Sequence, residues 1–387
     1  MRIFLLAGEP SGDRLGAALM MKLKQLLPEI KFEGVGGHAM ASEGLISQFP
    51  MEELSLMGLT EILPKYFRLR RRIHETVSAI ISMNADLLVT IDSPDFSLRV
   101  AKRLKSQSNI PIIHYVAPTI WAWRPKRAKK MVKVIDHVLA LFPFEPPYLE
   151  AAGMQCDYVG HPIISEPVPN ADDAAKFRTR NNLGDAPIIL VLPGSRSKEV
   201  SRLLKPFGDA LQIFLKDHPQ FRVVIPTVSA VEDFIKSRCA NWPGSPIILA
   251  TGDDSIQLTS DNKRGAFAAA NIALAASGTV SLELAASKTP MVIGYKFSWI
   301  TWQIIKRMAR INTATLVNIL SDSRSIPECF GSECSGEKIS RKLNEIWSNP
   351  NAQIDIMDLA IARLKADCET PSLRAAQVIV AYLGERE

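Results

Sequence analysis

The turn Ser277-Gly278-Thr279 has residue types that suit the binding of a phosphate group. The apolar run Ile272–Ala276 leads into this turn, and a helical pattern follows it. A turn between a strand and a helix directs backbone N–H groups and the positive end of the helix at one point. Gly278 allows a ligand to approach the backbone closely, and the two hydroxyl side chains can cap the helix or bond a phosphate oxygen. The same residues suit a purely structural turn equally well.

Glu283 lies about one turn into this predicted helix, where its carboxylate could accept hydrogen bonds from a ribose diol. A second apolar run, Met291–Tyr295, follows the helix. The segment therefore predicts a parallel strand–helix–strand unit, in which ligands bind outside the carboxyl edge of the sheet. A glutamate near the start of a helix also interacts favourably with the helix dipole, so a purely structural role remains an alternative.

Asp92 and Asp95 follow directly after the apolar run Leu87–Ile91, and Pro94 stiffens the segment between them. A carboxylate at the end of a buried strand could take a proton from an attacking hydroxyl, if it lies within hydrogen-bond reach. The alternative is that an aspartate caps the following helix. One aspartate could serve each purpose.

Gly194, Ser195 and Arg196 end another predicted strand, with Glu199 behind them. Gly194 permits close backbone approach, and the planar guanidinium of Arg196 offers a donor fork suited to a diphosphate. An ordinary surface loop is the alternative reading of these residues.

Ser11, Gly12 and Asp13 lie in a glycine-rich turn between the first predicted strand and the first helix. The spacing is neither GxGxxG nor GxxxxGK[ST], which argues against a dinucleotide or P-loop site. The turn could approach another ligand, or Ser11 or Asp13 could simply cap the helix.

Trp121, Trp123 and Arg124 stand before a run of lysines and arginines that includes Arg127. Tryptophans beside cations could hold a sugar ring or an acyl chain with an anionic group nearby. A solvated basic helix with core tryptophans is the alternative. No nucleic-acid-binding motif accompanies these residues.

The segment 57–83 combines an apolar stripe at helical spacing with a basic face. Its candidate membrane-facing residues are Leu63, Phe67, Leu69, Arg70 and Arg71. A helix of this kind can lie on an anionic bilayer, or it can pack its stripe on the core and leave the basic side in solvent.

The composition is that of a globular protein, with 47% hydrophobic and 22% charged residues among 387. A net charge of +6 favours anionic partners. The five cysteines are scattered and lack metal-site spacing, so we expect reduced thiols in a cytoplasmic protein. The N-terminal apolar run is short and predicts a first strand rather than a signal peptide. No window approaches the roughly 20 apolar residues of a membrane span.

Buried parallel strands are predicted in two groups, separated by a proline-rich and acidic stretch between His161 and Ala186. Two α/β halves of this kind place a cleft between the carboxyl edges of two sheets. The predicted strands are Ile3–Ala7, Phe32–Val35, Leu87–Ile91, Ile112–Val116, Val138–Leu141, Asp157–Val159, Ile188–Leu192, Val223–Ile225, Ile247–Ala250, Ile272–Ala276 and Met291–Tyr295. From Lys338 onward the pattern is helical.

Ten segments in order give the chain a resemblance to the lipid-A-disaccharide synthases, bacterial glycosyltransferases that join two acylated glucosamines. The matching segments are AGEPSGD, GVGG, MEELSLMGLTEIL, DSPDF, HYVAPTIWAWR, FPFE, VGHP, LPGSR, ASGTVSLE and PMVIGYK. The resemblance implies a GT-B fold of two Rossmann-like domains, 1–165 for the acceptor and membrane and 166–345 for the UDP-sugar donor. It also implies C-terminal helices, 346–387, that pack on the first domain or on a partner in a homodimer.

The implied reaction transfers diacylglucosamine from UDP-2,3-diacylglucosamine to the 6-hydroxyl of 2,3-diacylglucosamine 1-phosphate, with inversion and without a metal or other cofactor. The chain contains no Asp-x-Asp triplet, the usual metal site of glycosyltransferases. Charge on the departing UDP would then be met by Arg196 and by the helix after Thr279. The resemblance favours Asp95 as the base, with Asp92 in reserve.

The resemblance also implies a peripheral position on the anionic inner membrane of a Gram-negative bacterium, and it places Asn318 at the donor site. Two departures from the family pattern affect these assignments. Val317 stands where proline is common before that asparagine, and Ala117 and Thr119 replace serines. The alternatives are another GT-B enzyme that uses UDP-N-acetylglucosamine, such as the glycosyltransferase of peptidoglycan synthesis or a 2-epimerase, and a non-catalytic nucleotide-sugar or lipid-binding module.

Overall fold

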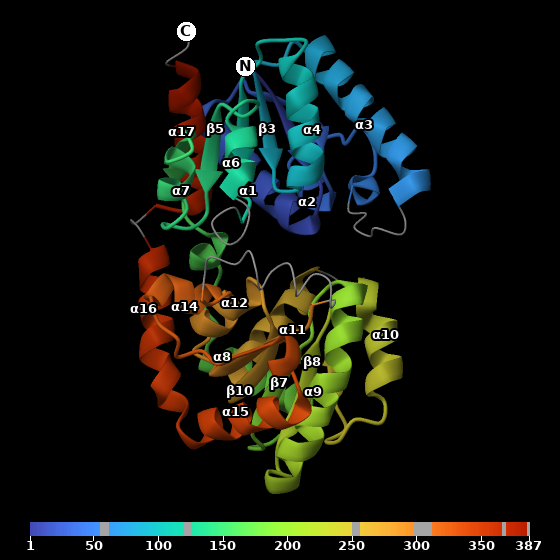
Figure 1. The fold of residues 1–387 in the computed structure, drawn as a ribbon, viewed down its shortest axis with the longest axis vertical. Coiled ribbons are helices and arrows are strands. Elements are labelled where there is room, and N and C mark those ends of the chain that lie inside the picture. Colours follow the sequence, from blue (N-terminus) through green and yellow to red (C-terminus); the bar gives the residue numbers. More distant parts are fainter. Residues whose placement is uncertain (55–61, 120–124, 250–255, 298–311, 366–368, 385–387) are drawn as a thin grey trace. The chain divides into compact units, whose positions relative to one another are not determined.

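A computed structural model of the chain describes residues 1–54, 62–119, 125–249, 256–297, 312–365 and 369–384. Within these residues the protein forms two compact units, the first from Met1–Ser165 with Lys365–Glu387 and the second from Glu166–Leu364. Each unit is built on one six-stranded sheet, and all the strand pairs are parallel (Figure 1). The predicted strands are all present.

The first sheet has the strand order β2-β1-β3-β4-β5-β6. Its strands are β1 (Arg2–Ala7), β2 (Lys31–Val35), β3 (Leu87–Ile91), β4 (Ile112–Tyr115), β5 (His137–Ala140) and β6 (Gln155–Tyr158). β3, β4 and β5 are buried along their whole length, as expected for continuous apolar strands covered on both faces. The chain steps in one direction from β1 to β2 and then in the other from β3 onward.

Crossovers between parallel strands are right-handed, so connections that step in opposite directions place their helices on opposite faces of the sheet. The helices of the first unit are α1 (Pro10–Leu26), α2 (His38–Ser42), α3 (Ile62–Ser82), α4 (Pro94–Lys105), α6 (Pro125–Met131), α7 (Pro146–Glu150) and α17 (Pro371–Gly384), with short 3₁₀ turns η1 (Met51–Glu53) and η3 (Pro162–Ser165). α1 packs against α2 and α17, whereas α3 packs against α4. Figure 1 shows α3 beside α4 and apart from α17.

The second sheet has the strand order β12-β11-β10-β7-β8-β9. The chain adds strands on one side of β7 up to β9 and on the other side from β10 onward, so the strand order reverses between β7 and β10. Its strands are β7 (Ile188–Leu192), β8 (Arg222–Pro226), β9 (Ile247–Leu249), β10 (Ile272–Ala276), β11 (Met291–Tyr295) and β12 (Glu328–Phe330). The sequence pattern did not predict β12, because it is short and only its central cysteine is buried. It nevertheless pairs with β11 along its three residues.

Helices cover both faces of the second sheet as well. They are α8 (Ala171–Arg180), α9 (Ser197–Asp217), α10 (Ser229–Cys239), α11 (Ile256–Ala269), α12 (Val280–Ala286), α14 (Leu316–Ser321), α15 (Gly336–Ser348) and α16 (Ile354–Leu364), with 3₁₀ turns η4 (Gly331–Glu333) and η5 (Pro350–Gln353). α9 packs against α10 and α15, and α8 packs against α11. Phe207, Phe214 and Phe221 lie fully buried in the core between α9, α15 and the sheet.

The last helices of the chain are shared between the two units. α15 and α16 pack within the second unit, where α16 contacts α12 and α14. α17 packs on α1 in the first unit. The Nη2 atom of Arg374 donates to the carbonyl of Tyr158 at 2.8 Å, and its guanidinium lies 5.4 Å from the centre of the Tyr158 ring, so α17 is tied to the end of β6.

The C-terminal half of the basic helix α3 belongs to the core. Ile73 is 9% exposed, Val77 is 1% exposed and Ile80 is fully buried, so the core-packing alternative holds for this part of the stripe. Phe67, in contrast, is 72% exposed, and the neighbouring Arg70 is exposed too. The segment 55–61 and the side chain of Leu63 lie outside the described part of the structure.

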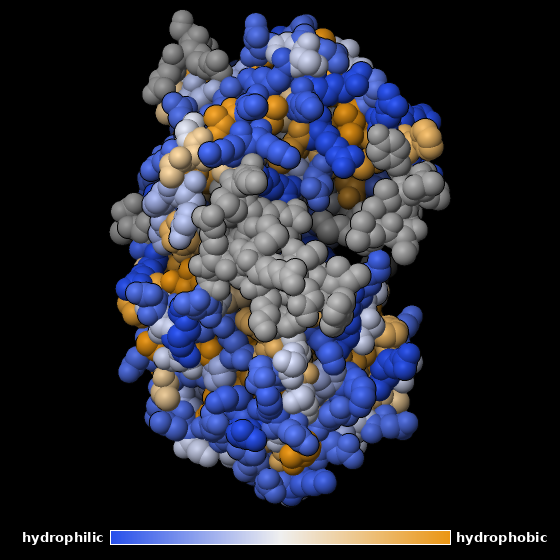
Figure 2. Space-filling model, in the orientation of Figure 1, coloured by the Kyte–Doolittle hydropathy of each residue, from blue (hydrophilic) through white to orange (hydrophobic). Residues whose placement is uncertain are grey.

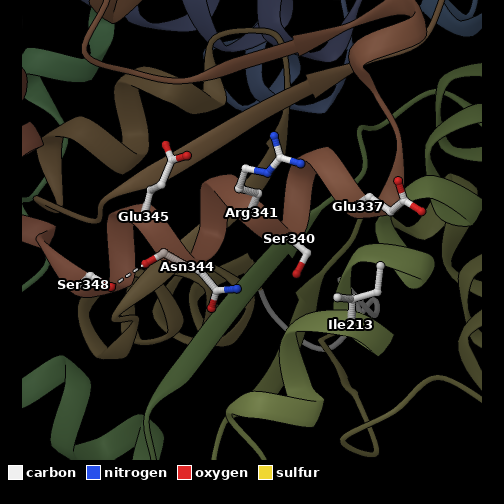
Figure 3. A pocket seen from close by; sticks show the side chains of 7 residues that line it. All are labelled: Ile213, Glu337, Ser340, Arg341, Asn344, Glu345 and Ser348. Atoms are coloured by element: carbon white, nitrogen blue, oxygen red, sulfur yellow. Dashed lines mark hydrogen bonds between the residues drawn. The ribbon is translucent and has the colours of Figure 1, made fainter.

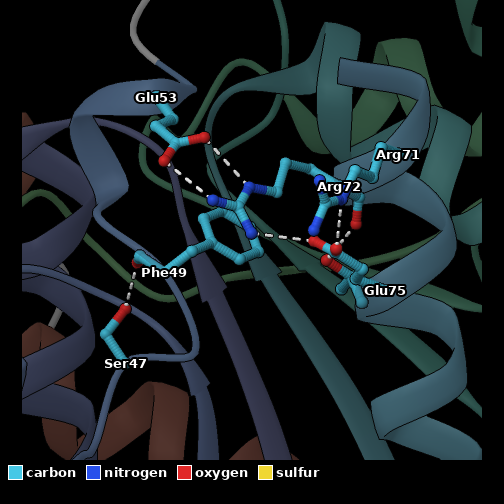
Figure 4. Close-up of polar contacts among 7 residues, drawn as sticks. Ser47, Phe49, Glu53, Arg71, Arg72 and Glu75 are labelled. Carbon is cyan, nitrogen blue, oxygen red and sulfur yellow. Dashed lines mark hydrogen bonds and ion pairs between the residues drawn. The ribbon is translucent and has the colours of Figure 1, made fainter. Parts of the chain in front are cut away.

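Arg72 fixes α3 at the point where it enters the core. Its guanidinium donates two hydrogen bonds to Glu53, at 2.9 and 2.8 Å, and one to Glu75 at 2.8 Å (Figure 4). The same group lies 4.4 Å from the centre of the Phe49 ring. Hydrogen bonding from Arg72 lowers the pKa of Glu53, so this contact remains ionic at neutral pH.

Candidate active site

The loops that follow β1 and β3 meet at the point where the strand order of the first sheet reverses, which we call its reversal point. Ala7 is the register partner of Ile91, so the residues after both strands emerge side by side. A Cβ at position 8 would lie 2.4 Å from the Oγ atom of Ser93, so only glycine allows the two loops to approach this closely. In parallel sheets, ligands bind at such a reversal point, outside the carboxyl ends of the strands.

The turn between β3 and α4 has an uncommon backbone. Asp92 and Ser93 adopt φ angles of 51° and 44°, in the left-handed region that non-glycine residues rarely occupy. The N–H of Asp92 donates to the carbonyl of Tyr115 at 2.9 Å, and the hydroxyl of Ser97 donates to the carbonyl of Asp92, also at 2.9 Å. Strained residues held in place by their neighbours are concentrated at functional sites. This turn therefore supports a site here independently of residue type.

Asp95 lies in the first turn of α4, with 75% of its side chain exposed. Its Oδ1 atom accepts a hydrogen bond at 2.8 Å from the Nη2 atom of Arg127, whose side chain is 20% exposed. Asp92 is half-buried in the preceding turn. The sequence pattern included Arg127 only as one cation in a basic run. Its contact with Asp95 depends on how α6 packs beside α4, and no local signal reveals it.

A neutral histidine lies near this ion pair. His114, on β4, is fully buried, and its Nδ1 atom lies 2.7 Å from the Oγ1 atom of Thr90. Burial, with a smaller contribution from the charge of Arg127, lowers the pKa of His114 to about 4. The imidazole is therefore uncharged at neutral pH. Trp121, Trp123 and Arg124, the predicted acceptor-binding residues that follow β4, lie outside the described residues.

Asp13 connects α1 to the start of α2. Its carboxylate is 5% exposed and accepts the backbone N–H groups of Gly37, Ala39 and Met40 at 2.7, 2.9 and 3.1 Å. These are N-terminal donors of α2, so Asp13 caps a helix other than its own. Ser11 is exposed on the first turn of α1.

Gly12 is buried against the end of β3. A Cβ added to it would lie 3.3 Å from the carbonyl oxygen of Ile91. The structure thus gives Gly12 and Asp13 positioning roles around the loop, and their predicted contact with substrate stays a prediction.

The second sheet has a matching reversal point. Leu192 at the end of β7 is the register partner of Ala275 on β10, so the loops 193–196 and 277–279 leave the sheet side by side. The predicted donor-site turn and the predicted diphosphate-binding loop are therefore brought together by the fold, although more than 80 residues separate strand-pair partners such as Ile189 and Ile272.

Glu199 organises the loop before α9. Gly194 has a φ of 110°, and a Cβ at this position would lie 2.1 Å from the Oε2 atom of Glu199. The carboxylate of Glu199 accepts the backbone N–H groups of Ser195 and Arg196 and the hydroxyl of Tyr295. Burial outweighs the positive charge of Arg196 and these hydrogen bonds, and it raises the pKa of Glu199. The loop is thus folded around a carboxylate, with Arg196 exposed at its end.

The turn before α12 is open to solvent. Gly278 and Thr279 are exposed, and nothing lies within 4 Å of a Cβ added to Gly278. Among the residues that the structure describes, the N–H groups of these two residues have no hydrogen-bond acceptor. Ser277 is half-buried, and the Oγ atom of Ser281 donates to the carbonyl of Gly278 at 2.9 Å. Glu283 forms an ion pair with Lys263 of α11.

Asn318 lies in a buried hydrogen-bond network. It is fully buried on α14. Its Nδ2 atom donates to the carbonyl of Ile326 at 2.9 Å and to Thr313 at 3.2 Å, and its Oδ1 atom accepts the N–H of Ile326 at 3.0 Å. The amide therefore joins α14 to the segment before β12. A direct contact with the donor would require these bonds to be exchanged, so donor binding by Asn318 stays a prediction.

Two surface hollows lie away from both reversal points. One, of about 570 Å³, lies between the C-terminal half of α9 and α15 and is lined by Ile213 and by polar side chains of α15 (Figure 3). The other, of about 510 Å³, lies between α9 and α10 beside Trp242. Neither includes a predicted site residue.

Within the described ranges, no group of three or more His, Cys, Asp or Glu side chains is arranged to hold a metal ion. In the same residues, no helix has the length and apolar character needed to cross a bilayer.

Comparison with protein families identifies a match over residues 3–380 to the family described as lipid-A-disaccharide synthetase. The chain is 56% identical to the lipid-A-disaccharide synthase of Ruegeria pomeroyi over 383 residues, which cover 99% of this chain and 96% of the relative. It is 42% identical to that of Rhodospirillum centenum, covering 99% and 95%.

Solved structures of low sequence identity share the fold. The S. aureus MnaA–UDP co-structure has a TM-score of 0.66 at 12% identity, covering 100% of this chain and 96% of that one. The UDP-GlcNAc 2-epimerase of Neisseria meningitidis bound to UDP-GlcNAc has a TM-score of 0.64 at 12% identity, covering 100% of both chains. With the two parallel six-stranded sheets, these neighbours confirm the predicted GT-B fold.

Glu199→Gln tests whether burial of the Glu199 carboxylate in the loop before α9 destabilises its ionised form. Because burial raises the pKa of Glu199 above its ordinary value of 4.5, the folded protein holds this proton more tightly than the unfolded chain. The free energy of unfolding of the wild type, relative to the variant, should therefore fall as the pH rises above 4.5. Urea titrations at several pH values measure this difference.

Tyr295→Phe is the matched variant for this measurement. It removes one donor that favours the ionised form of Glu199, so it should enlarge the fall with pH. If the stability of the wild type relative to Glu199→Gln instead rises with pH, the charge of Arg196, the N–H donors and Tyr295 together outweigh burial.

Proposed function

The chain belongs to the lipid-A-disaccharide synthase family. On that premise we propose which residues at the edges of its two sheets bind the substrates and which supply the base. The enzyme transfers 2,3-diacylglucosamine from UDP to the 6-hydroxyl of 2,3-diacylglucosamine 1-phosphate, giving lipid A disaccharide 1-phosphate and UDP. The observation that carries our assignment of residues is the meeting of two candidate loops at the reversal point of each sheet.

The second unit binds the UDP-sugar in this proposal. Arg196 and the exposed N–H groups of Gly278 and Thr279 stand beside the adjacent ends of β7 and β10, where a diphosphate would meet a guanidinium and backbone donors together. Glu283 would accept the ribose hydroxyls after exchanging its contact with Lys263. Gly194, Ser195 and Ser277 shape the two loops around the ligand.

Departure of UDP leaves negative charge on its diphosphate, and stabilisation of that charge lowers the barrier. In the proposed mechanism the bond between the anomeric carbon and UDP breaks while the acceptor oxygen forms a bond from the opposite face. One such displacement inverts the configuration and needs no covalent intermediate. The side chain of Arg196 and the N–H groups of the 277–279 turn are preorganised to meet the charge.

The first unit supplies the base. Asp95 is an exposed carboxylate at the carboxyl edge of the first sheet, where it could accept the proton of the 6-hydroxyl as that oxygen attacks. Asp92, one turn earlier, is the reserve candidate. Ser11 and Gly12 of the adjacent loop, with Trp121, Trp123 and Arg124, are proposed to hold the acceptor sugar and its acyl chains.

The part of α3 around Phe67, Arg70 and Arg71 is proposed to rest on the anionic inner membrane. Phe67, Arg70 and Arg71 present one apolar ring and two cations to solvent, and Leu69 is half-buried beside them. The described residues on the face seen in Figure 2 are mainly hydrophilic, with apolar residues in small groups. Attachment would then depend on charge together with a few inserted side chains. A homodimer through the C-terminal helices is a further proposal, for which the exposed side of α17 is available.

Release of UDP in the presence of both lipid substrates tests the reaction itself. Mass spectrometry of the product should show the disaccharide with UDP-2,3-diacylglucosamine and none with UDP-N-acetylglucosamine. A disaccharide formed from UDP-N-acetylglucosamine would favour the other GT-B enzymes. Donor binding without release of UDP would instead indicate a binding module.

Asp95→Asn should lower kcat by about 10²–10⁴-fold, because the acceptor hydroxyl loses its base. Calorimetry should show that UDP still binds, since the nucleotide is held by the second unit. Asp92→Asn is the matched variant. If its loss of kcat exceeds that of Asp95→Asn, the two aspartates exchange roles in the proposal.

Arg196→Ala should lower kcat/KM by about 10²–10³-fold, the effect of losing one donor to a developing anion. Lys198→Ala provides the control, because Lys198 is an exposed cation on the first turn of α9, two residues after Arg196. Equal losses of kcat/KM in the two variants would mean that Arg196 contributes only its positive charge and makes no specific contact with the diphosphate.

Phe67→Ser should weaken binding to phosphatidylglycerol vesicles by about 10- to 100-fold, because burial of one phenylalanine ring contributes roughly 1.5–3 kcal/mol. The residual binding should fall as salt is raised. Ile81→Ser, at a 36% exposed position near the other end of α3, is the control. Unchanged vesicle binding of Phe67→Ser would show that α3 does not contact the bilayer through this residue.

A further inference from the structure

The ion pair between Asp95 and Arg127 joins two elements at the proposed acceptor side of the enzyme. Arg127 Nη2 donates to Asp95 Oδ1 at 2.8 Å, from α6 to the first turn of α4. The pair is asymmetric, because the side chain of Asp95 is 75% exposed and that of Arg127 only 20%. The fold thus covers most of the arginine side chain, while its Nη2 atom contacts a carboxylate that is mostly in water.

This pair is poorly suited to a purely structural role. An ion pair with one partner largely in solvent adds little to the stability of a fold. The nearby histidine adds no charge, since burial keeps His114 neutral at physiological pH. A half-buried guanidinium whose visible partner is a solvent-exposed carboxylate is instead an arrangement in which a stronger anion can take the place of that carboxylate.

The same contact bears on the proposed role of Asp95 as the base. While its Oδ1 atom accepts from Arg127, that oxygen is engaged, and the proton of the acceptor hydroxyl has to go to one of the remaining lone pairs of the carboxylate. Movement of the arginine away from Asp95 would make both carboxylate oxygens accessible to the hydroxyl.

We propose that Arg127 binds the 1-phosphate of the acceptor, and that Asp95 holds the guanidinium in place until this phosphate replaces it. The inference rests on the proposed function and assigns the residue that recognises the charged end of the acceptor. A guanidinium binds phosphate through two parallel hydrogen bonds, and a phosphate dianion attracts it more strongly than a carboxylate. Arrival of the correct acceptor then frees the base beside it.

The geometry of the acceptor sugar agrees with this arrangement. Carbon 1, which carries the phosphate, and carbon 5, which carries the 6-hydroxymethyl group, are both bonded to the ring oxygen. The phosphate and the attacking hydroxyl therefore project from the same edge of the ring. Two neighbouring side chains, a cation for the phosphate and a carboxylate for the hydroxyl, can serve both groups at once.

Other cations near Arg127 have a different relation to the site. Lys129 and Lys130 are exposed on α6, and Arg99 is exposed on α4 one turn after Asp95. Flexible, solvated cations of this kind raise the local concentration of an anionic substrate and weaken with salt. They do not share the contact with Asp95. This difference gives a matched control on the same helix.

The test compares two acceptors, 2,3-diacylglucosamine 1-phosphate and the same sugar without phosphate, in mixed micelles with the UDP donor. We expect Arg127→Gln to raise the KM for the phosphorylated acceptor by about 10- to 100-fold, the effect of losing hydrogen bonds between charged groups. The KM for the neutral acceptor should change less than threefold. Arg127→Lys, which keeps the charge and loses the planar fork, should give an intermediate value, and Lys130→Gln should resemble the wild type.

Soluble glucosamine 1-phosphate provides a second readout. It should inhibit the wild type competitively against the acceptor, and its inhibition constant should rise in Arg127→Gln in parallel with the KM. Uncharged glucosamine should inhibit the two proteins equally. Thermal unfolding of each variant establishes that the protein is folded.

Two outcomes would overturn the inference. Equal losses with both acceptors would mean that Arg127 only positions Asp95, and an unchanged KM for the phosphorylated acceptor would mean that the phosphate is bound elsewhere. Failure of the proposed function gives a different pattern. If Asp95→Asn retains full kcat while Arg127→Gln still loses discrimination between the two acceptors, the base assignment fails and the phosphate assignment stands.

Discussion

The pairing of β1 with β3 and of β7 with β10 is the constraint on which the candidate site depends. In each sheet the chain turns back past its own first strand, so two strand ends that are far apart in sequence become neighbours. Hydrogen bonding between parallel strands fixes their separation at about 4.8 Å. Loops that leave these ends cannot avoid one another, and each pair offers polar groups from two sources to one ligand.

Buried polar side chains hold these loops in shape. Asp13 gathers three N–H groups at the start of α2, and Glu199 gathers two at the start of α9. Asn318 does the same for the segment before β12. In each case a side chain satisfies backbone groups that a turn would otherwise leave without partners. Arg196 and Gly278 lie exposed in the two loops at the adjacent ends of β7 and β10.

The two units present different polar groups at their candidate sites. The second unit offers donors, a guanidinium and backbone N–H groups, which suit a departing nucleotide. The first unit offers a carboxylate, which suits the removal of a proton. The pairing of that carboxylate with Arg127 places a cation beside it.

The amino-acid sequence by itself determined the local features of this protein. Continuous apolar runs located every strand except β12, the turns Ser277-Gly278-Thr279 and Asp92-Ser93-Pro94 stood at strand ends as expected, and ten short segments identified the family. The tertiary structure alone decided which of these features act together. It paired Leu192 with Ala275 on neighbouring strands, brought Arg127 to Asp95 and buried the Asn318 side chain. On α3 it left Phe67 exposed and buried Ile73, Val77 and Ile80. Periodicity and turn chemistry act over a few residues, so they are readable from the chain. Strand order and the partners of a buried polar group depend on residues far away in sequence, and only the folded chain brings those residues together.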